Sequence, residues 1–232
     1  MTRLALSLLA CLIVGCAETP LAPTVSPESL RQRAAARRSE GKPADAEDLL
    51  GQAIRAQPTQ TRDQRSAAAD LRRELASLRM STDDLAGAER LYREALALLE
   101  TAPRGADEAI INLRTQLAGL CYRRSRFDEA AEFYRTVLAL EVALLGETHP
   151  DPLGTMSILG GLELKRGKFR EAETLFRRQL RGVQQVHGTE KREVTPVLDN
   201  LADVLDKSGQ AAEAARLRAE AARIRRKLCD EC

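Results

Sequence analysis

Apolar positions along this chain recur at spacings of three and four, the spacing that places side chains on one face of an α-helix. The pattern also repeats at a longer interval: five alanines stand 42 residues apart, and four of them follow a leucine by thirteen positions. These are Ala46, Ala88, Ala130, Ala172 and Ala214, after Leu75, Leu117, Leu159 and Leu201. A fixed interval of this length predicts a solenoid of about five similar helix pairs over residues 28–228.

Helix boundaries follow from the proline, glycine and capping residues. Ser26 is placed to cap a helix that begins with Pro27, and a second helix is expected from Pro43 to Ala56. Between the third and fourth units, Asp151 is the expected cap of a helix with Pro152 in its first turn. The first and last units depart from the pattern, which is typical of repeats that close the ends of a stack.

Small residues are required where two helices cross closely. Ala130 and Ala172 are expected at such crossings, because a methyl group lets the helix axes approach to about 8–9 Å. Large side chains at neighbouring positions are expected to fill the space between pairs and are assigned no chemistry. They are Phe127, Tyr134, Phe169 and Phe176.

The third and fourth units carry a recognisable motif. Leu117-Ala118, Phe127, Glu129-Ala130 and Phe133-Tyr134 recur 42 residues later as Leu159-Gly160, Phe169, Glu171-Ala172 and Leu175-Phe176. This pattern resembles the tetratricopeptide repeat, and its length is similar to that of the kinesin-light-chain type. The resemblance implies an all-α, right-handed superhelix of antiparallel helix pairs. It also implies a concave face, lined by the first helix of each pair, that receives protein or peptide segments.

The candidate peptide-binding groove consists of first-helix residues outside the apolar stripe. Gly119 and Gly161 leave the groove open to a partner backbone, while Arg123 and Lys165, one repeat apart, are placed to hold a carboxylate. Amide side chains there are placed to bond an extended peptide. The full set is Asn112, Thr115, Gln116, Gly119, Tyr122, Arg123, Ser157, Ile158, Gly161, Lys165 and Asn200. A solvated helix face remains the alternative for each residue taken singly.

The N-terminal segment has the features of an export signal. Residues 1–15 combine one basic residue with a short apolar core, and Ile13-Val14-Gly15-Cys16 resembles a bacterial lipobox. This resemblance implies cleavage before Cys16 and its modification with acyl chains such as palmitate, which anchor a protein to a membrane. Cys11 is a rival position with a shorter apolar core. Residues 16–27 then form a proline-rich tether.

The residue after the lipidated cysteine bears on localisation. Ala17 stands where aspartate is the familiar signal for retention in the inner membrane. The resemblance to bacterial lipoproteins therefore implies the outer membrane, with the folded part facing the periplasm.

Composition narrows the chemistry. The 36 basic and 34 acidic residues give a net charge of +2, which provides no bulk attraction for nucleic acid. No catalytic or phosphate-binding motif is present, the carboxylates are expected on solvent faces, and neither an enzyme, a cofactor, a metal nor a small-molecule substrate is predicted. His149 is expected to have a structural role in a turn.

Three cysteines lie beyond the signal segment. Cys121 is expected to be a buried thiol on a first helix. Cys229 and Cys232 form a CxxC tail over residues 229–232, where an oxidising compartment favours a disulfide. Unpaired thiols are the alternative for this tail.

These features together predict a lipid-anchored protein of the bacterial envelope that binds protein segments in its groove. In that role it serves as a scaffold or assembly factor for an envelope complex. The alternative is a structural envelope protein whose stack contacts further copies of itself.

Overall fold

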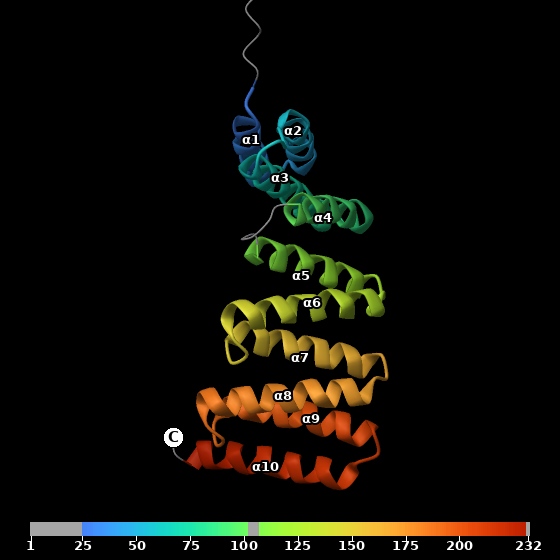
Figure 1. Ribbon diagram of the computed structural model, residues 1–232, viewed down its shortest axis with the longest axis vertical. Coiled ribbons are helices and arrows are strands. Elements are labelled where there is room, and N and C mark those ends of the chain that lie inside the picture. Colours follow the sequence, from blue (N-terminus) through green and yellow to red (C-terminus); the bar gives the residue numbers. More distant parts are fainter. Residues whose placement is uncertain (1–24, 102–106, 231–232) are drawn as a thin grey trace, which may run out of the picture.

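The computed structural model describes residues 25–101 and 107–230, which form ten α-helices and one short 3₁₀ helix (Figure 1). The helices make five consecutive pairs: α1 (Pro27–Ser39) with α2 (Pro43–Ala56), α3 (Arg62–Ser81) with α4 (Leu85–Glu100), α5 (Asp107–Arg123) with α6 (Phe127–Leu145), α7 (Pro150–Lys165) with α8 (Phe169–His187), and α9 (Thr195–Lys207) with α10 (Ala211–Asp230). The 3₁₀ helix η1 (Arg192–Val194) leads directly into α9.

The pairs form a stack. The second helix of each pair packs against the first helix of the next, as α2 does on α3 and α6 on α7. In Figure 1, α2 is seen nearly end-on whereas α5 to α8 lie across the view, so the helix direction turns along the stack. The prediction of an all-α array of about five antiparallel helix pairs is confirmed.

The repeated small residues lie where the helices cross. All five alanines of the 42-residue series are at most 1% exposed, as expected for methyl groups between closely packed helices. Gly160 extends this requirement: a Cβ atom at that position would lie 2.8 Å from the Phe176 ring. Only a hydrogen at Gly160 leaves room for that ring between α7 and α8.

Each pair turns at the same position of the repeat, and the turn residue has a positive φ in all five units. The positions are Gly41, Asp83, Ser125, Gly167 and Gly209, with φ of 73°, 63°, 58°, 75° and 85°. Glycine adopts this left-handed conformation freely, whereas an L side chain strains it. The turns of the second and third units, at Asp83 and Ser125, therefore carry backbone strain that the glycine turns of the other three units avoid.

Helix starts agree with the sequence in one case and differ in another. The Ser26 hydroxyl accepts a hydrogen bond from the Ser29 amide and caps α1, as predicted. The predicted cap at Asp151 is wrong, because α7 begins at Pro150 and His149 is its cap. Proline already has a helical φ, so it occupies the first helical position here and moves the cap back by two residues.

The predictions of a signal segment, a lipidated cysteine and a tether concern the N-terminal residues. None of the helices in the described part of the chain combines the length and apolar content needed to cross a bilayer. The predicted signal segment 1–15, Cys16, and the tether as far as Thr24 fall outside the described residues.

Candidate functional site

A groove of about 620 Å³ lies between α5 and α7, where the C-terminal end of α6 contributes to its wall. We call it the α5/α7 groove. Its lining residues are Glu108, Ile111, Asn112 and Thr115 of α5, Glu141, Leu144 and Leu145 of α6, and Pro150, Asp151, Gly154, Thr155 and Ile158 of α7. The groove thus combines three carboxylates with exposed aliphatic side chains, and none of the described residues that line it is basic.

A second hollow of about 520 Å³ adjoins this groove between α3 and α5. It shares Glu108 and Asn112 with the α5/α7 groove, so both open on the surface formed by first helices. Its polar walls include Asp70 and Arg73, which form an ion pair at 3.1 Å. The first helices therefore line a continuous hollowed surface over three of the five units.

The structure places the predicted groove residues in three groups. Asn112, Thr115 and Ile158 line the α5/α7 groove, and Gln116 lines the neighbouring hollow. A Cβ added at Gly119 or Gly161 would meet open space. The remaining uncharged positions are the exposed Tyr122 and the half-buried Ser157 and Asn200, none of which is among the lining residues of these two hollows.

The two predicted cations already have partners within the chain. Arg123 Nη2 lies 3.1 Å from the Asp83 carboxylate. Lys165 Nζ lies 4.4 Å from the centre of the Phe127 ring and 4.8 Å from that of Tyr122. A carboxylate bound between Arg123 and Lys165 would have to compete with these contacts.

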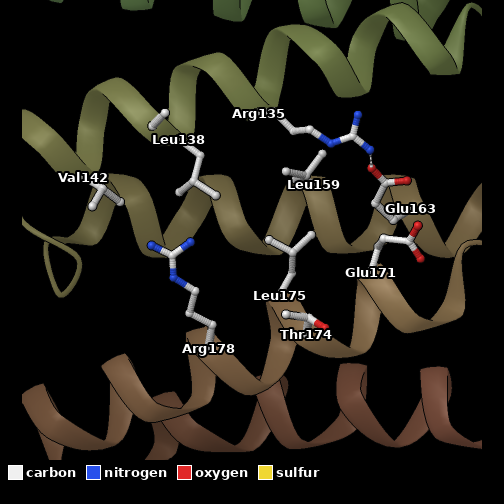
Figure 2. Close-up of a pocket in the computed structure, with 10 residues that line it drawn as sticks. Arg135, Leu138, Val142, Leu159, Glu163, Glu171, Thr174, Leu175 and Arg178 are labelled. Atoms are coloured by element: carbon white, nitrogen blue, oxygen red, sulfur yellow. Dashed lines mark hydrogen bonds and ion pairs between the residues drawn. The ribbon is translucent and has the colours of Figure 1, made fainter.

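Second helices form another hollow, the α6/α8 cleft of about 500 Å³ (Figure 2). Leu138, Leu159 and Leu175 give it an apolar wall. Two of the charged side chains at its edge are arginines with acidic partners: Arg135 binds Glu163, and Arg178 Nε lies 2.5 Å from Glu147. This cleft therefore has two arginines at its edge, whereas none of the described residues that line the α5/α7 groove is basic.

Buried ion pairs hold successive units together, which the sequence analysis did not predict. We define the α4/α5 joint as Glu89, Arg93, Cys121, Arg124 and Arg126. The Glu89 carboxylate is 7% exposed and accepts hydrogen bonds from Arg93, Arg124 and Arg126 at 2.5–3.1 Å. The hydrogen bonds from Arg126 and, to a lesser extent, Arg93 outweigh the effect of burial and lower the pKa of Glu89 to about 2.

The α6/α7 joint, defined as Asp128, Ala131, Arg135, Glu163 and Arg166, contains a second buried carboxylate. Glu163 is 1% exposed and binds Arg135 as well as Arg166, the latter at 2.7 Å. Arg166 Nε also donates to Asp128 at 2.9 Å. The expectation that the carboxylates lie on solvent faces is therefore wrong for Glu89 and Glu163, whose arginine partners make burial possible.

One group of possible metal ligands lies within the α4/α5 joint. Ligand atoms of Glu89, Cys121 and Glu129 lie within 4.8 Å of one another. Arg126 donates to both carboxylates and approaches the Cys121 sulfur to 3.4 Å. The guanidinium thus takes the position that a cation would need, and burial raises the pKa of the Cys121 thiol.

The other predicted residues are located as follows. His149 caps α7 through its Nδ1 atom, which accepts from the Asp151 amide at 3.3 Å. Cys121 is buried, as predicted. Cys229 is exposed near the end of α10, and its predicted disulfide partner Cys232 lies outside the described residues.

Known proteins share this repeat in sequence and this arrangement of helices in structure. The family model "Tetratricopeptide repeat" matches residues 107–182 and 151–227. No curated protein sequence matches the chain. A putative kinesin light chain of Podosopora anserina with nearly identical repeats is similar in structure, with a TM-score of 0.69 and 21% identity over 88% of this chain and 99% of that one.

Two further structures show the same arrangement of helices. BtubC (BKLC) from P. vanneervenii has a TM-score of 0.63 at 22% identity, over 87% of this chain and 80% of that one. MamA has a TM-score of 0.62 at 11% identity, over 88% of this chain and 94% of that one. At these identities the likeness concerns the fold.

Proposed function

Because the chain belongs to the tetratricopeptide repeat family, whose members are generically scaffolds for protein–protein interaction, we propose that it binds a segment of another protein in the α5/α7 groove. The observation that carries this proposal is the hollowed first-helix surface. There Asn112 and Thr115 offer hydrogen-bonding groups beside the exposed side chain of Ile158. An extended or helical segment needs both kinds of contact to bind.

We further propose that this scaffold acts in the bacterial envelope, where it assembles a complex while anchored to the membrane through acyl chains on Cys16. Support comes from the lipobox-like run Ile13-Val14-Gly15-Cys16 and from the proline-rich tether that follows it. The residue Ala17 favours the outer membrane, with the repeats in the periplasm. Two or more acyl chains hold a protein on a bilayer stably, as a scaffold for membrane-bound partners requires.

Site-specific cross-linking tests the binding role. A photoreactive amino acid at Ile158 or Asn112 is expected to cross-link one partner segment in intact cells, whereas the same amino acid at Thr174, which lines the α6/α8 cleft, is not. Equal capture at the two faces would contradict the groove assignment. Cross-links from Ile158 to a second copy of this chain would favour the self-associating structural protein instead.

Lipid attachment has its own test. Cells grown with an alkyne-tagged palmitate are expected to label the wild-type chain and the Cys11→Ser variant, while Cys16→Ser abolishes labelling. Sucrose-gradient separation of the two membranes then locates the labelled protein. Labelling that survives Cys16→Ser, or a labelled protein in the inner membrane, would refute the corresponding part of the proposal.

A further inference from the structure

One position in the α5/α7 groove departs from the repeat pattern. Glu141 stands 42 residues from Leu99 and from Val183, both of which are buried. Its neighbour across the groove wall, Thr155, likewise stands 42 residues from Leu113 and Val197. The adjacent units fill this pair of positions with aliphatic side chains, so stacking of the helices does not require a carboxylate there.

The Glu141 carboxylate is buried without full pairing. The residue is 7% exposed, and its Oε2 atom has no hydrogen-bond partner among the described residues. A hydrogen bond from Thr155 favours the ionised form, but burial is the stronger influence and raises the pKa of Glu141. A buried carboxylate oxygen without a donor is costly in a folded protein, and the cost disappears when a ligand supplies one.

The surroundings of Glu141 select a cation as that donor. Glu108 and Asp151 line the same groove, and none of the described residues lining it is basic. The nearby His149 uses its Nδ1 atom to accept from the Asp151 amide at 3.3 Å. A positively charged group entering the groove would meet three carboxylates and no competing cation among the described lining residues.

Beside these carboxylates lies an exposed aliphatic surface. Leu144, Leu145 and Ile158 are 52%, 40% and 51% exposed. Ile158 stands 42 residues from Gln116 and from Asn200, so this unit has an apolar side chain where its neighbours have polar ones. The groove therefore inverts the usual arrangement, with polar groups in its buried part and aliphatic groups at its exposed edge.

We propose that the α5/α7 groove binds a basic peptide segment, in which the lysine or arginine head group pairs with Glu141 and an adjacent aliphatic residue packs on Leu144, Leu145 and Ile158. The proposal rests on the binding role proposed above and names the chemistry of its ligand. A volume of about 620 Å³ lies within the range of pockets that enclose small groups. The aliphatic stem of the basic side chain would lie against the apolar edge while its charge reaches the carboxylate.

Short peptides on an array provide the test, with the purified full chain as the bound protein. Each peptide carries lysine, arginine, norleucine or glutamate between leucines. Binding to the lysine and arginine peptides is expected to exceed binding to the norleucine peptide by about tenfold or more, as a charge-assisted hydrogen bond allows. Equal binding of norleucine and lysine peptides, or preference for glutamate, would overturn the proposal.

Variants connect this preference to Glu141. Glu141→Gln is expected to reduce the lysine-to-norleucine ratio to near one, whereas Glu132→Gln, an exposed acid on the same helix, leaves it unchanged. Glu141→Leu combined with Thr155→Val introduces side chains of the kind found in the neighbouring units. This variant is expected to lose the cation preference and to unfold at the same or a higher temperature than the wild type.

The outcomes separate a binding role from a structural one. A cation preference that survives Glu141→Gln, or a fall in unfolding temperature on the aliphatic exchange, would overturn the role given to Glu141. Cross-linking at Ile158 tests the binding of a partner independently of the peptides. Capture of a partner segment without any cation preference would therefore refute this inference alone, and absence of capture would refute the proposed function.

Discussion

The α4/α5 and α6/α7 joints both bury a carboxylate between arginines, but the carboxylate comes from the second helix of a pair in one joint and from the first helix in the other. In each joint one arginine on a second helix and one just after a first helix bind a buried carboxylate: Arg93 and Arg124 in the former, Arg135 and Arg166 in the latter. Arg135 follows Arg93 by 42 residues, and Arg166 follows Arg124 by the same interval. The carboxylate, however, belongs to the second helix as Glu89 in one joint and to the first helix as Glu163 in the other.

In each joint a small residue occupies the position that holds the acid in the other joint. Glu89 is opposed by Cys121, and the positions 42 residues further on are Ala131 and Glu163. On α2 and α8 the positions equivalent to Glu89 are Glu47 and Glu173, which bind Arg79 of α3 and Arg177 of α8 itself. The two joints thus bury a carboxylate between arginines at equivalent positions although different helices supply that carboxylate.

The largest effect is expected from removing the acid of the α6/α7 joint. Glu163→Ala leaves Arg166, whose side chain is 9% exposed, with only the exposed Asp128 as partner. Breaking a buried ion pair in this way is expected to lower the free energy of unfolding by about 3–5 kcal/mol. Urea denaturation followed by circular dichroism measures the loss. A loss below about 1 kcal/mol would show that the pair contributes no more than a surface one.

Glu89→Ala in the α4/α5 joint is expected to cost less, about 2 kcal/mol. Its arginine partners are more exposed than Arg166, with 47%, 37% and 29% of their side chains accessible, and they regain water when the acid is removed. The same urea titration compares the two variants directly. A cost for Glu89→Ala above that for Glu163→Ala would contradict the ranking by burial.

Acid should weaken the α4/α5 joint in a defined range. The pKa of Glu89 is lowered from 4.5 to about 2 in the folded chain, so its stabilising contribution is complete above about pH 4.5 and declines as the pH falls toward 2. Protonation leaves the side chain in place, so the loss stays below that of Glu89→Ala. Unfolding temperatures of the wild type and Glu89→Gln are expected to converge over this interval. A constant difference between them would exclude Glu89 as the titrating group.

A matched exchange tests whether the acid can change sides. Glu89→Ala with Cys121→Glu gives the α4/α5 joint the arrangement of Ala131 and Glu163, and is expected to recover all but about 1 kcal/mol of the stability. Cys121→Glu alone is the control, because it places two carboxylates within reach of each other and should destabilise. A double variant no more stable than Glu89→Ala would show that the joints are not interchangeable.

These comparisons also show what the sequence predicts. The five helix pairs follow from the alanine series, since close packing permits only small residues at each crossing. The groove is only partly predictable, because the resemblance implies a face lined by first helices, whereas Glu141, Leu144 and Leu145 come from α6. Comparing positions 42 residues apart would have found Glu141, an acid among buried aliphatic residues.

Side-chain pairing was less accessible to sequence analysis. Arg123 and Lys165 appeared free to bind a carboxylate because Asp83 lies 40 positions from Arg123 and Phe127 belongs to another unit from Lys165. Such contacts depend on the rotation between units and on side-chain conformation. Neither of these is fixed by the period of the repeat.

The turn beside each joint provides the smallest and most specific contrast. Ser125 has a φ of 58° in the turn of the third unit, whereas the equivalent position of the fourth unit is Gly167, with a φ of 75°. Ser125→Gly is expected to stabilise the chain by about 0.5–1 kcal/mol because it relieves left-handed strain, and Gly167→Ser to destabilise it by a similar amount. Ser157→Gly, within α7, is the control and should destabilise, since glycine weakens a helix interior. Thermal unfolding of the three variants measures these changes in stability. If Ser125→Gly and Ser157→Gly change stability in the same direction, backbone strain at the turn does not distinguish the third unit from the fourth.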